Sequence, residues 1–407
     1  MKWKRKFREL IYKLISSTIP YLIPKNRKKI IFGSMNGQYY GDNSKHLYEW
    51  ILANRKDLAP IWVTKNKNVF KYLRSEGRPV KLANTYSSIY HLFTAKVGLF
   101  TNSLKDIALH PNLVPKTIKL IALRHGRSVK KIRFARENHK LSKEEAYERK
   151  RESDRICYVI STSEFISDIQ EKCLRVGREK HIVTGYPRND QIFSPCSHNF
   201  QHWKTYLGNL KPSKVVLYGP SWRHGRNFTQ FFPFDDFDAY ELKNYLEKNN
   251  ILLLLRPHMN EYEKSKNLVK FLKDLSSLSP NIRLCMHDDF ADVNTLLPFV
   301  DILISDYSAL YHDFLLLDKP MIFIPYDYDE FKKQNGFLYD YFKNLPGKSV
   351  GSFNDFLHEL NNLCIGEDKF IKKRQILRDK IHAYQNGSSC ERVVDLVDSI
   401  LENKVQM

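Results

Sequence analysis

The chain has 407 residues, more than one hydrophobic core usually holds, so two domains are expected. Hydrophobic residues make up 42% of it, which excludes an intrinsically disordered chain. The 66 basic residues exceed the 45 acidic ones, and the formal net charge of +21 points to nucleic acid, an anionic membrane surface or a phosphorylated substrate as partner. The cysteines are scattered without a CxxC pair, so we expect free thiols and no disulfide or zinc framework.

Residues 1–27 have the pattern of a basic amphipathic helix. Lysine and arginine dominate this segment, and its only acidic residue is Glu9. Apolar side chains recur at helical spacing and share one face, which comprises Trp3, Phe7, Leu10, Ile11, Leu14 and Ile15. We expect the segment to lie on an anionic membrane surface; the alternative is a helix packed on the protein's own surface. The expected membrane contacts are Trp3, Lys4, Arg5, Phe7 and Ile11.

From residue 28 to about residue 205, short apolar runs alternate with helical stretches. The runs are typical of buried strands and lie at residues 30–32, 61–64, 97–101, 118–122, 158–161 and 181–184. This alternation predicts one doubly wound, Rossmann-like sheet. Residues 135–155 are highly charged and are expected to form a solvent-facing helix, whereas the chain from residue 190 to about residue 211 is expected to be loop-like.

A second α/β series occupies residues 206–407. Its expected strands lie at residues 215–218, 252–255, 282–285, 302–304 and 321–324, and helical signals return over residues 368–404. We therefore predict an α/β fold with two Rossmann-like domains, residues 28–205 and 206–407, facing a central cleft. The motifs of dinucleotide sites, P-loops and zincins are absent, and no carboxylate cluster has the spacing of a metal site.

Residues 301–330 form a predicted strand–helix–strand unit with a polar turn after the first strand. In a right-handed parallel unit, the end of the strand and the start of the helix lie at the same edge of the sheet, where ligands bind. Backbone N–H groups and the hydroxyls of Ser305 and Ser308 can cradle a phosphate there. Both serines are equally compatible with helix capping, so the residues alone leave the two interpretations open.

His125 and Gly126 follow the strand expected at residues 118–122. This position is exposed at the ligand edge of an open α/β sheet, and glycine lets the backbone approach a substrate. Imidazole is well matched to accept a proton from a hydroxyl group near neutral pH. His125 is therefore a candidate general base, with a turn or capping residue as the alternative.

Cations follow two strands of the second series in the same way. Arg256 and His258 follow the strand at residues 252–255, and Arg223 follows the strand at residues 215–218. Such side chains can bind a phosphate through charge-assisted hydrogen bonds and stabilise a leaving oxygen. The recurrence of this pattern in both halves favours a phosphate-containing substrate.

The order and spacing of these motifs resemble the CDP-glycerol:poly(glycerophosphate) glycerophosphotransferase family, which includes teichoic acid primases, polymerases and related capsule enzymes. The resemblance runs from residue 31 to about residue 392. Its landmarks are Asp42-Asn43-Ser44-Lys45 with Glu49, His125-Gly126 with Lys130, residues 185–190, residues 218–223, Arg256-Pro257-His258, residues 301–313, Lys319-Pro320, Tyr326-Asp327, and Asn386-Gly387 near Arg392.

The resemblance implies a GT-B-like fold, with the donor in the C-terminal half and the acceptor at the N-terminal half. The donor would be CDP-glycerol or CDP-ribitol, the acceptor a lipid-linked saccharide or a polyol-phosphate polymer, and no cofactor or metal is expected. It also implies a peripheral membrane protein on the cytoplasmic face. The expected site residues are His125 and His258 for catalysis; Arg223, Arg256, Ser305, Asp306, Ser308 and Asp313 for the donor phosphates; and Asn43, Lys45, Lys130, Arg188 and Asn189 on the acceptor side or in support.

The chain departs from the family pattern beside the expected base. The family usually has Thr-Pro-Leu-Lys after His-Gly, whereas this chain has Arg127-Ser128-Val129-Lys130. The additional cation suggests a different or more anionic acceptor. An alternative function is that of a GT-B glycosyltransferase with a UDP-sugar donor. No nucleic-acid-binding signature is present, so nucleic acid is not an expected partner.

Overall fold

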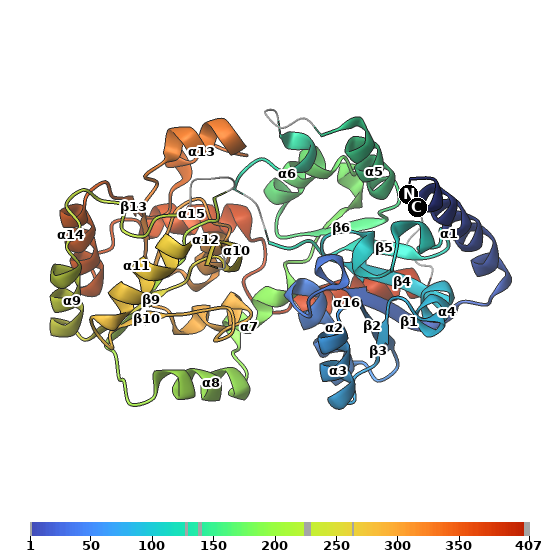
Figure 1. The fold of residues 1–407 in the computed structure, drawn as a ribbon, viewed down its shortest axis with the longest axis horizontal. Coiled ribbons are helices and arrows are strands. Elements are labelled where there is room, and N and C mark those ends of the chain that lie inside the picture. The colour runs from blue at the N-terminus through green and yellow to red at the C-terminus, as the bar shows by residue number, and fades with distance from the viewer. Residues whose placement is uncertain (1, 127–128, 137–140, 224–228, 263, 403–407) are drawn as a thin grey trace. The chain divides into compact units, whose positions relative to one another are not determined.

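The computed structural model describes residues 2–126, 129–136, 141–223, 229–262 and 264–402. The chain forms two compact units, and each is built on one parallel sheet (Figure 1). Unit 1 comprises Met1–Gly126, Leu141–Asp190 and Asn386–Met407, and unit 2 comprises Arg127–Lys140 and Gln191–Gln385. Two Rossmann-like units were predicted, and the structure confirms them.

The sheet of unit 1 is seven-stranded, in the order β3-β2-β1-β4-β5-β6-β7. Its strands are β1 (Asn26–Gly33), β2 (Ala59–Thr64), β3 (Val80–Leu82), β4 (Ala95–Phe100), β5 (Lys119–Ala122), β6 (Tyr158–Ser161) and β7 (His181–Val183). All of its strand pairs are parallel, as the α/β alternation predicts. Every predicted strand of this half is present. The edge strand β3 was missed because three residues carry too little periodicity.

Helices cover this sheet, and most of them begin at a side-chain cap. They are α1 (Lys2–Leu22), α2 (Asp42–Asn54), α3 (Lys67–Ser75), α4 (Tyr86–Thr94), α5 (Lys143–Ser153), α6 (Glu164–Leu174) and α16 (Ser389–Leu401). The side chains of Asn66, Thr85 and Ser163 accept hydrogen bonds from the first turns of α3, α4 and α6. Helix α5 is the charged helix expected within residues 135–155, and a capping box starts it.

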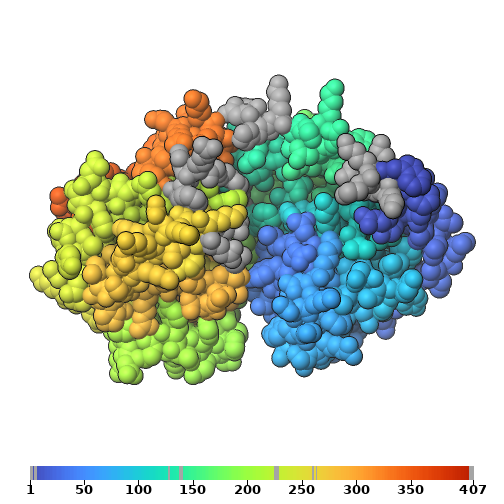
Figure 2. Space-filling model, in the orientation of Figure 1, coloured from blue at the N-terminus to red at the C-terminus, as the bar shows by residue number. Residues whose placement is uncertain are grey.

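Helix α1 lies at the surface of unit 1, where Figure 2 shows it in dark blue. Its inner face contacts α4 and the short 3₁₀ helix Pro111–Leu113, and the Ser16 hydroxyl donates to the Asn112 carbonyl at 2.6 Å. On its outer face, Trp3, Phe7, Leu10 and Leu14 are exposed to solvent. The helix therefore packs on the protein and still presents an apolar face. Among the helices that are described, none combines the length and apolar character needed to cross a membrane.

Unit 2 has a six-stranded parallel sheet in the order β10-β9-β8-β11-β12-β13. Its strands are β8 (Lys214–Tyr218), β9 (Ile251–Leu255), β10 (Ile282–Leu284), β11 (Ile302–Ser305), β12 (Met321–Phe323) and β13 (Lys348–Ser349). Its helices are α8 (Ser197–Leu207), α9 (Ala239–Lys248), α10 (Met259–Tyr262), α11 (Lys266–Ser277), α12 (Leu310–Phe314), α13 (Tyr328–Asn335), α14 (Phe353–Cys364) and α15 (Ile371–Ile381); α7 (Asp190–Phe193) spans the boundary between the units. The predicted strands are again present, and only β13, of two residues, was missed.

The predicted division of the chain, 28–205 and 206–407, needs two corrections. Helix α16 belongs to unit 1, where Val393, Val397 and Ile400 are part of the core that also contains Ile30 and Trp62; Figure 1 shows this red helix among blue strands. Residues 127–140, which follow β5 in sequence, belong to unit 2. An amphipathic helix has an apolar face in the sequence, but the pattern does not show which sheet this face covers.

The segment before β8 also differs from its prediction. Part of the expected loop forms helix α8, and Trp203 on this helix stacks on Phe299 with ring centroids 5.2 Å apart. Packing of this aromatic pair explains why a segment with weak helical signals is ordered as a helix. The cysteines are free thiols, as predicted.

Candidate functional site

His125 lies just beyond the end of β5, with its side chain exposed. The preceding residue, Arg124, is buried and has a φ of 58°, a left-handed conformation that is costly for a residue other than glycine. Gly126 has a φ of 61°. The residues on both sides of His125 thus have left-handed backbone conformations, and such a turn presents the exposed imidazole in a position from which it could act on a substrate.

Asn43, at the start of α2, holds this turn in place. Its side-chain amide donates hydrogen bonds to the carbonyls of Leu123 and Arg124, both at 2.9 Å. Its side-chain oxygen accepts a hydrogen bond from the backbone N–H of Arg188 at 3.1 Å. The side chain is completely buried. Of the two predicted roles, acceptor contact or support, the geometry favours support.

Arg188 completes the same arrangement. Its guanidinium lies 3.4 Å from the carboxylate of Asp42 and next to Gly126, whose φ of 61° favours glycine. Asn189 is buried beside Arg188 in the 3₁₀ helix Pro187–Asn189. The ammonium of Lys45, also in α2, lies 5.5 Å from the ring centroid of Tyr40.

Asp106 was missed by the sequence analysis. Its buried carboxylate accepts hydrogen bonds from the backbone N–H groups of Asn36, Thr101 and Asn102 at 2.6–2.9 Å. Burial raises the pKa of this carboxyl group, and the backbone donors oppose the rise. Asp106 thereby joins the loops after β1 and β4, and Asn36 in the first of these is held at a φ of 59°. The polar run after β4 was a signal for it, by the same strand-end argument that identified His125.

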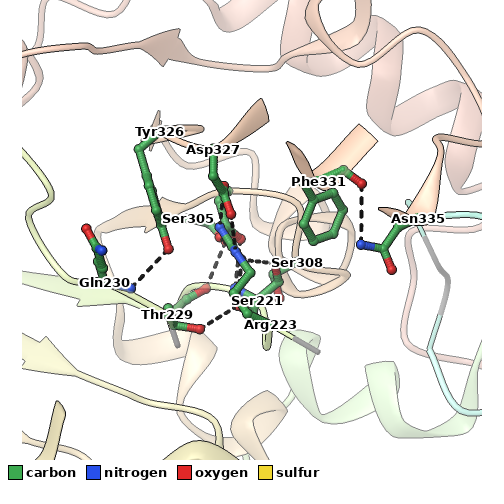
Figure 3. Close-up of polar contacts among 12 residues, drawn as sticks. Ser221, Arg223, Thr229, Gln230, Ser305, Ser308, Tyr326, Asp327, Phe331 and Asn335 are labelled. Carbon is green, nitrogen blue, oxygen red and sulfur yellow. Dashed lines mark hydrogen bonds and ion pairs between the residues drawn. The ribbon is translucent and has the colours of Figure 1, made fainter. Parts of the chain in front are cut away.

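In unit 2, Arg223 is enclosed by acidic and aromatic side chains (Figure 3). Its guanidinium donates to Asp306 at 2.7 Å and to both carboxylate oxygens of Asp327 at 2.7 and 2.9 Å. The rings of Tyr307, Tyr326 and Phe331 have centroids 5.1–5.2 Å from it. Only 6% of the residue is exposed. Two carboxylates therefore outweigh the charge of this cation.

The neighbouring predicted phosphate ligands are also engaged within the protein. Asp306 accepts a hydrogen bond from the backbone N–H of Ser221 at 2.7 Å, and the hydroxyl of Ser305 donates to the Gly219 carbonyl at 2.9 Å. Both side chains are buried. Arg223, Asp306 and Ser305 thus support the loops after β8 and β11, and their contact with donor phosphates stays a prediction.

Two further predicted donor ligands, Ser308 and Asp313, lie after β11. The hydroxyl of Ser308 accepts a hydrogen bond from the backbone N–H of Leu310 at 3.3 Å, a local turn contact just before α12, whose N-cap residue is Ala309. Asp313 is buried in α12.

Arg256 and His258 follow β9 as predicted. The guanidinium of Arg256 donates to the carbonyls of Met286 and Phe290 at 3.1 and 2.7 Å, which holds the loop after β10. His258 is exposed, and the indole of Trp222 stacks on it with ring centroids 5.4 Å apart. Partial desolvation, followed by the charges of Lys130, Arg256 and His287, lowers the pKa of His258. This edge of unit 2 is thus a set of cationic and imidazole side chains suited to an anion.

Lys130 requires a correction. It was predicted as an acceptor-side or supporting residue within the first domain, residues 28–205, but the structure places it in unit 2. Arg127 and Ser128, the substitutions beside the expected base, lie outside the described residues, as do the side chains of Lys4 and Arg5. Within the described ranges, no group of three or more His, Cys, Asp or Glu side chains is placed to hold a metal ion.

Comparisons with known proteins identify the family and the fold of this chain. The sequence model of the CDP-Glycerol:Poly(glycerophosphate) glycerophosphotransferase family matches residues 15–399. The teichoic acid glycerol-phosphate transferase of Staphylococcus aureus (strain NCTC 8325 / PS 47) is 27% identical, over 97% of this chain and 99% of the relative. The teichoic acid poly(glycerol phosphate) polymerase of Bacillus subtilis (strain 168) is 25% identical over 97% of this chain, which spans about half, 52%, of that polymerase.

Two solved structures share the fold. The wall teichoic acid polymerase TagF aligns with a TM-score of 0.77 at 21% identity, covering 98% of this chain and 94% of that chain. A UDP-GlcNAc 2-epimerase from Neisseria meningitidis, bound to UDP-GlcNAc, aligns with a TM-score of 0.57 at 13% identity, covering 91% and 99%. Both are similar in fold, and the TagF likeness extends over nearly the whole chain.

Proposed function

Because this chain belongs to the CDP-glycerol:poly(glycerophosphate) glycerophosphotransferase family, we propose that it transfers glycerol phosphate from CDP-glycerol to a hydroxyl group of an acceptor. The observation that carries the proposal is the exposed imidazole of His125 on a strained, internally fixed turn at a strand end. The cationic edge of unit 2 at Arg256 and His258 supports a donor with a diphosphate. The TagF polymerase has also been solved with CDPG.

The reaction is an in-line displacement at phosphorus. His125 accepts the proton of the acceptor hydroxyl, whose oxygen forms a bond to the phosphorus that carries glycerol. The bond from that phosphorus to the bridging oxygen of the diphosphate breaks, and CMP leaves with the electron pair. Arg256 and His258 stabilise the negative charge that develops on the diphosphate. No atom changes oxidation state, so the proposal includes no redox cofactor.

The acceptor and the cellular location form a further part of the proposal. The acceptor is a polyol-phosphate polymer or a lipid-linked saccharide of a teichoic acid or capsule type, and a ribitol donor remains an alternative to glycerol. The protein binds the cytoplasmic face of the membrane peripherally through α1. The exposed apolar face of α1 and the net charge of +21 support binding to an anionic surface.

The test is to incubate the purified protein and a membrane fraction with CDP-glycerol, CDP-ribitol and UDP-sugars, and to identify the products by mass spectrometry. We expect CMP and a product that is heavier by one or more polyol phosphates. The His125→Ala variant should lose roughly 10²- to 10⁴-fold in turnover while its affinity for CDP-glycerol is unchanged. His198→Ala, a change at an exposed histidine of α8, is the matched control.

Two results contradict the proposal. Turnover by the His125→Ala variant at the wild-type rate excludes this residue as the base. Release of UDP from a UDP-sugar, without turnover of either CDP-polyol, indicates the glycosyltransferase alternative.

A further inference from the structure

The segment that carries Lys130 is fixed to unit 2 by its backbone. Lys130 forms an antiparallel bridge with Phe337, Lys131 donates to the carbonyl of Gly336 at 3.2 Å, and Leu338 donates to the carbonyl of Val129 at 3.0 Å. The side chain of Val129 is buried. Residues 129–131 therefore form a short extended addition to unit 2, although His125, only five positions before Lys130, lies in unit 1.

This addition places the Lys130 side chain against the Arg223 cluster. The ammonium lies 5.9 Å from the ring centroid of Phe331, the same ring that lies 5.2 Å from the Arg223 guanidinium. Desolvation and the charges of Arg136 and Arg223 lower the pKa of Lys130, and Asp306 opposes this effect. The fold thus holds a half-buried ammonium near two guanidinium groups, an arrangement that a bound anion would stabilise.

The charges around Arg223 in unit 2 require a further cation if a diphosphate is to bind there, and Lys130 can supply it. Arg223 is paired with Asp306 and Asp327, so these three side chains together carry a net negative charge. They repel a diphosphate unless another cation is present. The charge of Lys130 also reaches His258, whose pKa it lowers, so the two groups belong to one electrostatic environment. An ammonium with three N–H donors can bridge from this cluster to phosphate oxygens.

We propose that Lys130 binds the diphosphate of a nucleoside diphosphate–linked donor in unit 2. The inference rests on the proposed function for the identity of the nucleotide, and it replaces the acceptor-side or supporting role predicted from the sequence. A residue that contacts the diphosphate should discriminate between ligands by the number of their phosphates. Ligands with two phosphates should depend on Lys130 more strongly than CMP does.

The experiment is calorimetric titration of the full-length protein with CDP-glycerol, CDP and CMP. For Lys130→Gln we expect roughly ten- to hundredfold weaker binding of CDP-glycerol and CDP, because one charge-assisted hydrogen bond is lost, and a smaller change for CMP. Lys131→Gln changes the adjacent lysine and should bind all three ligands as the wild type does. Lys130→Arg, which keeps the charge, should recover part of the affinity.

A second variant separates ligand binding from folding. Lys130→Met keeps the aliphatic stem near Phe331 and removes only the charge, so its melting temperature should match that of the wild type. Unchanged CDP-glycerol affinity in a folded Lys130→Gln or Lys130→Met protein, with a raised KM for the acceptor, overturns the inference and returns Lys130 to the acceptor side. If the wild type binds only uridine nucleotides, the proposed function fails, and the same comparison of UDP with UMP decides the role of Lys130.

Discussion

His125 and Arg223 were both selected as polar residues at strand ends, yet their surroundings are opposite. His125 is exposed on a turn, whereas Arg223 is enclosed by Asp306, Asp327 and three aromatic rings. An exposed imidazole can exchange a proton with a substrate. A buried guanidinium already matched by two carboxylates is a structural support, because removing one member would leave an uncompensated buried charge.

Asn43 is expected to position His125, because its side-chain amide donates hydrogen bonds to the two carbonyl groups that precede this histidine. We expect Asn43→Ala to lower kcat by roughly 10²-fold through misplacement of His125, with the Kd for CDP-glycerol unchanged. Buried carbonyl groups left without donors should also lower the free energy of unfolding by about 1–3 kcal/mol. Steady-state kinetics, calorimetry and urea unfolding measure these three quantities.

The matched control for this prediction is Asn54→Ala on the same helix, where the exposed side-chain amide donates to the Trp50 carbonyl one turn earlier. Its kcat should equal that of the wild type. If Asn43→Ala also retains the wild-type kcat, Asn43 does not position the base. A weaker donor affinity with unchanged kcat would likewise contradict the positioning role.

At the scale of elements, α1 packs on the protein, the alternative that the sequence left open beside membrane binding, and it still exposes an apolar face. Its inner face is tied to unit 1 through Ser16 and Asn112, and its outer face exposes a row of large apolar side chains. A helix held in place with one apolar face in solvent is suited to insertion in the plane of a membrane surface. The inner contacts make α1 a fixed part of unit 1.

The double variant Phe7→Glu/Leu14→Glu tests the outer face. Each buried apolar side chain contributes about 1.5–3 kcal/mol, so binding to anionic phospholipid vesicles should weaken at least tenfold per substitution. Ile376→Glu, which makes the same type of change at an exposed position of α15, should bind vesicles as the wild type does. Co-sedimentation measures the bound fraction. Equal binding by the double variant and the wild type would remove α1 as the membrane element.

At the scale of the whole molecule, the chain does not divide into two consecutive halves. It leaves unit 1 after Gly126, returns at Leu141, leaves again after Asp190, and returns at Asn386 with α16. The carboxylate of Asp190 accepts hydrogen bonds from the backbone N–H groups of Ser389 and Cys390 at 2.9 and 2.8 Å. The start of α16 is thereby hydrogen-bonded to Asp190, the residue after which the chain leaves unit 1 for the second time.

A chain that ends at Gln385 should lose the stability of unit 1. Four buried side chains of α16 (Val393, Val394, Val397 and Ile400) would be removed from its core, a loss of roughly 10 kcal/mol, comparable to the stability of a whole domain. Hydrogen exchange read by mass spectrometry should show lost protection in β1 and β4 and retained protection in β8 and β9. A chain that ends at Glu402 is the control. Lost protection in β8 and β9 instead would restore the predicted division.

The sequence by itself determined the two parallel sheets and the strand ends that carry His125, Arg256 and His258, because apolar runs and the polar residues after them are local features. Only the tertiary structure decided which unit α16 and Lys130 belong to, since packing partners lie far away in the sequence. It also decided that Arg223 is enclosed, because this depends on Asp306, 83 positions away. Exposure, and with it the capacity to meet a substrate, is a property of the folded chain.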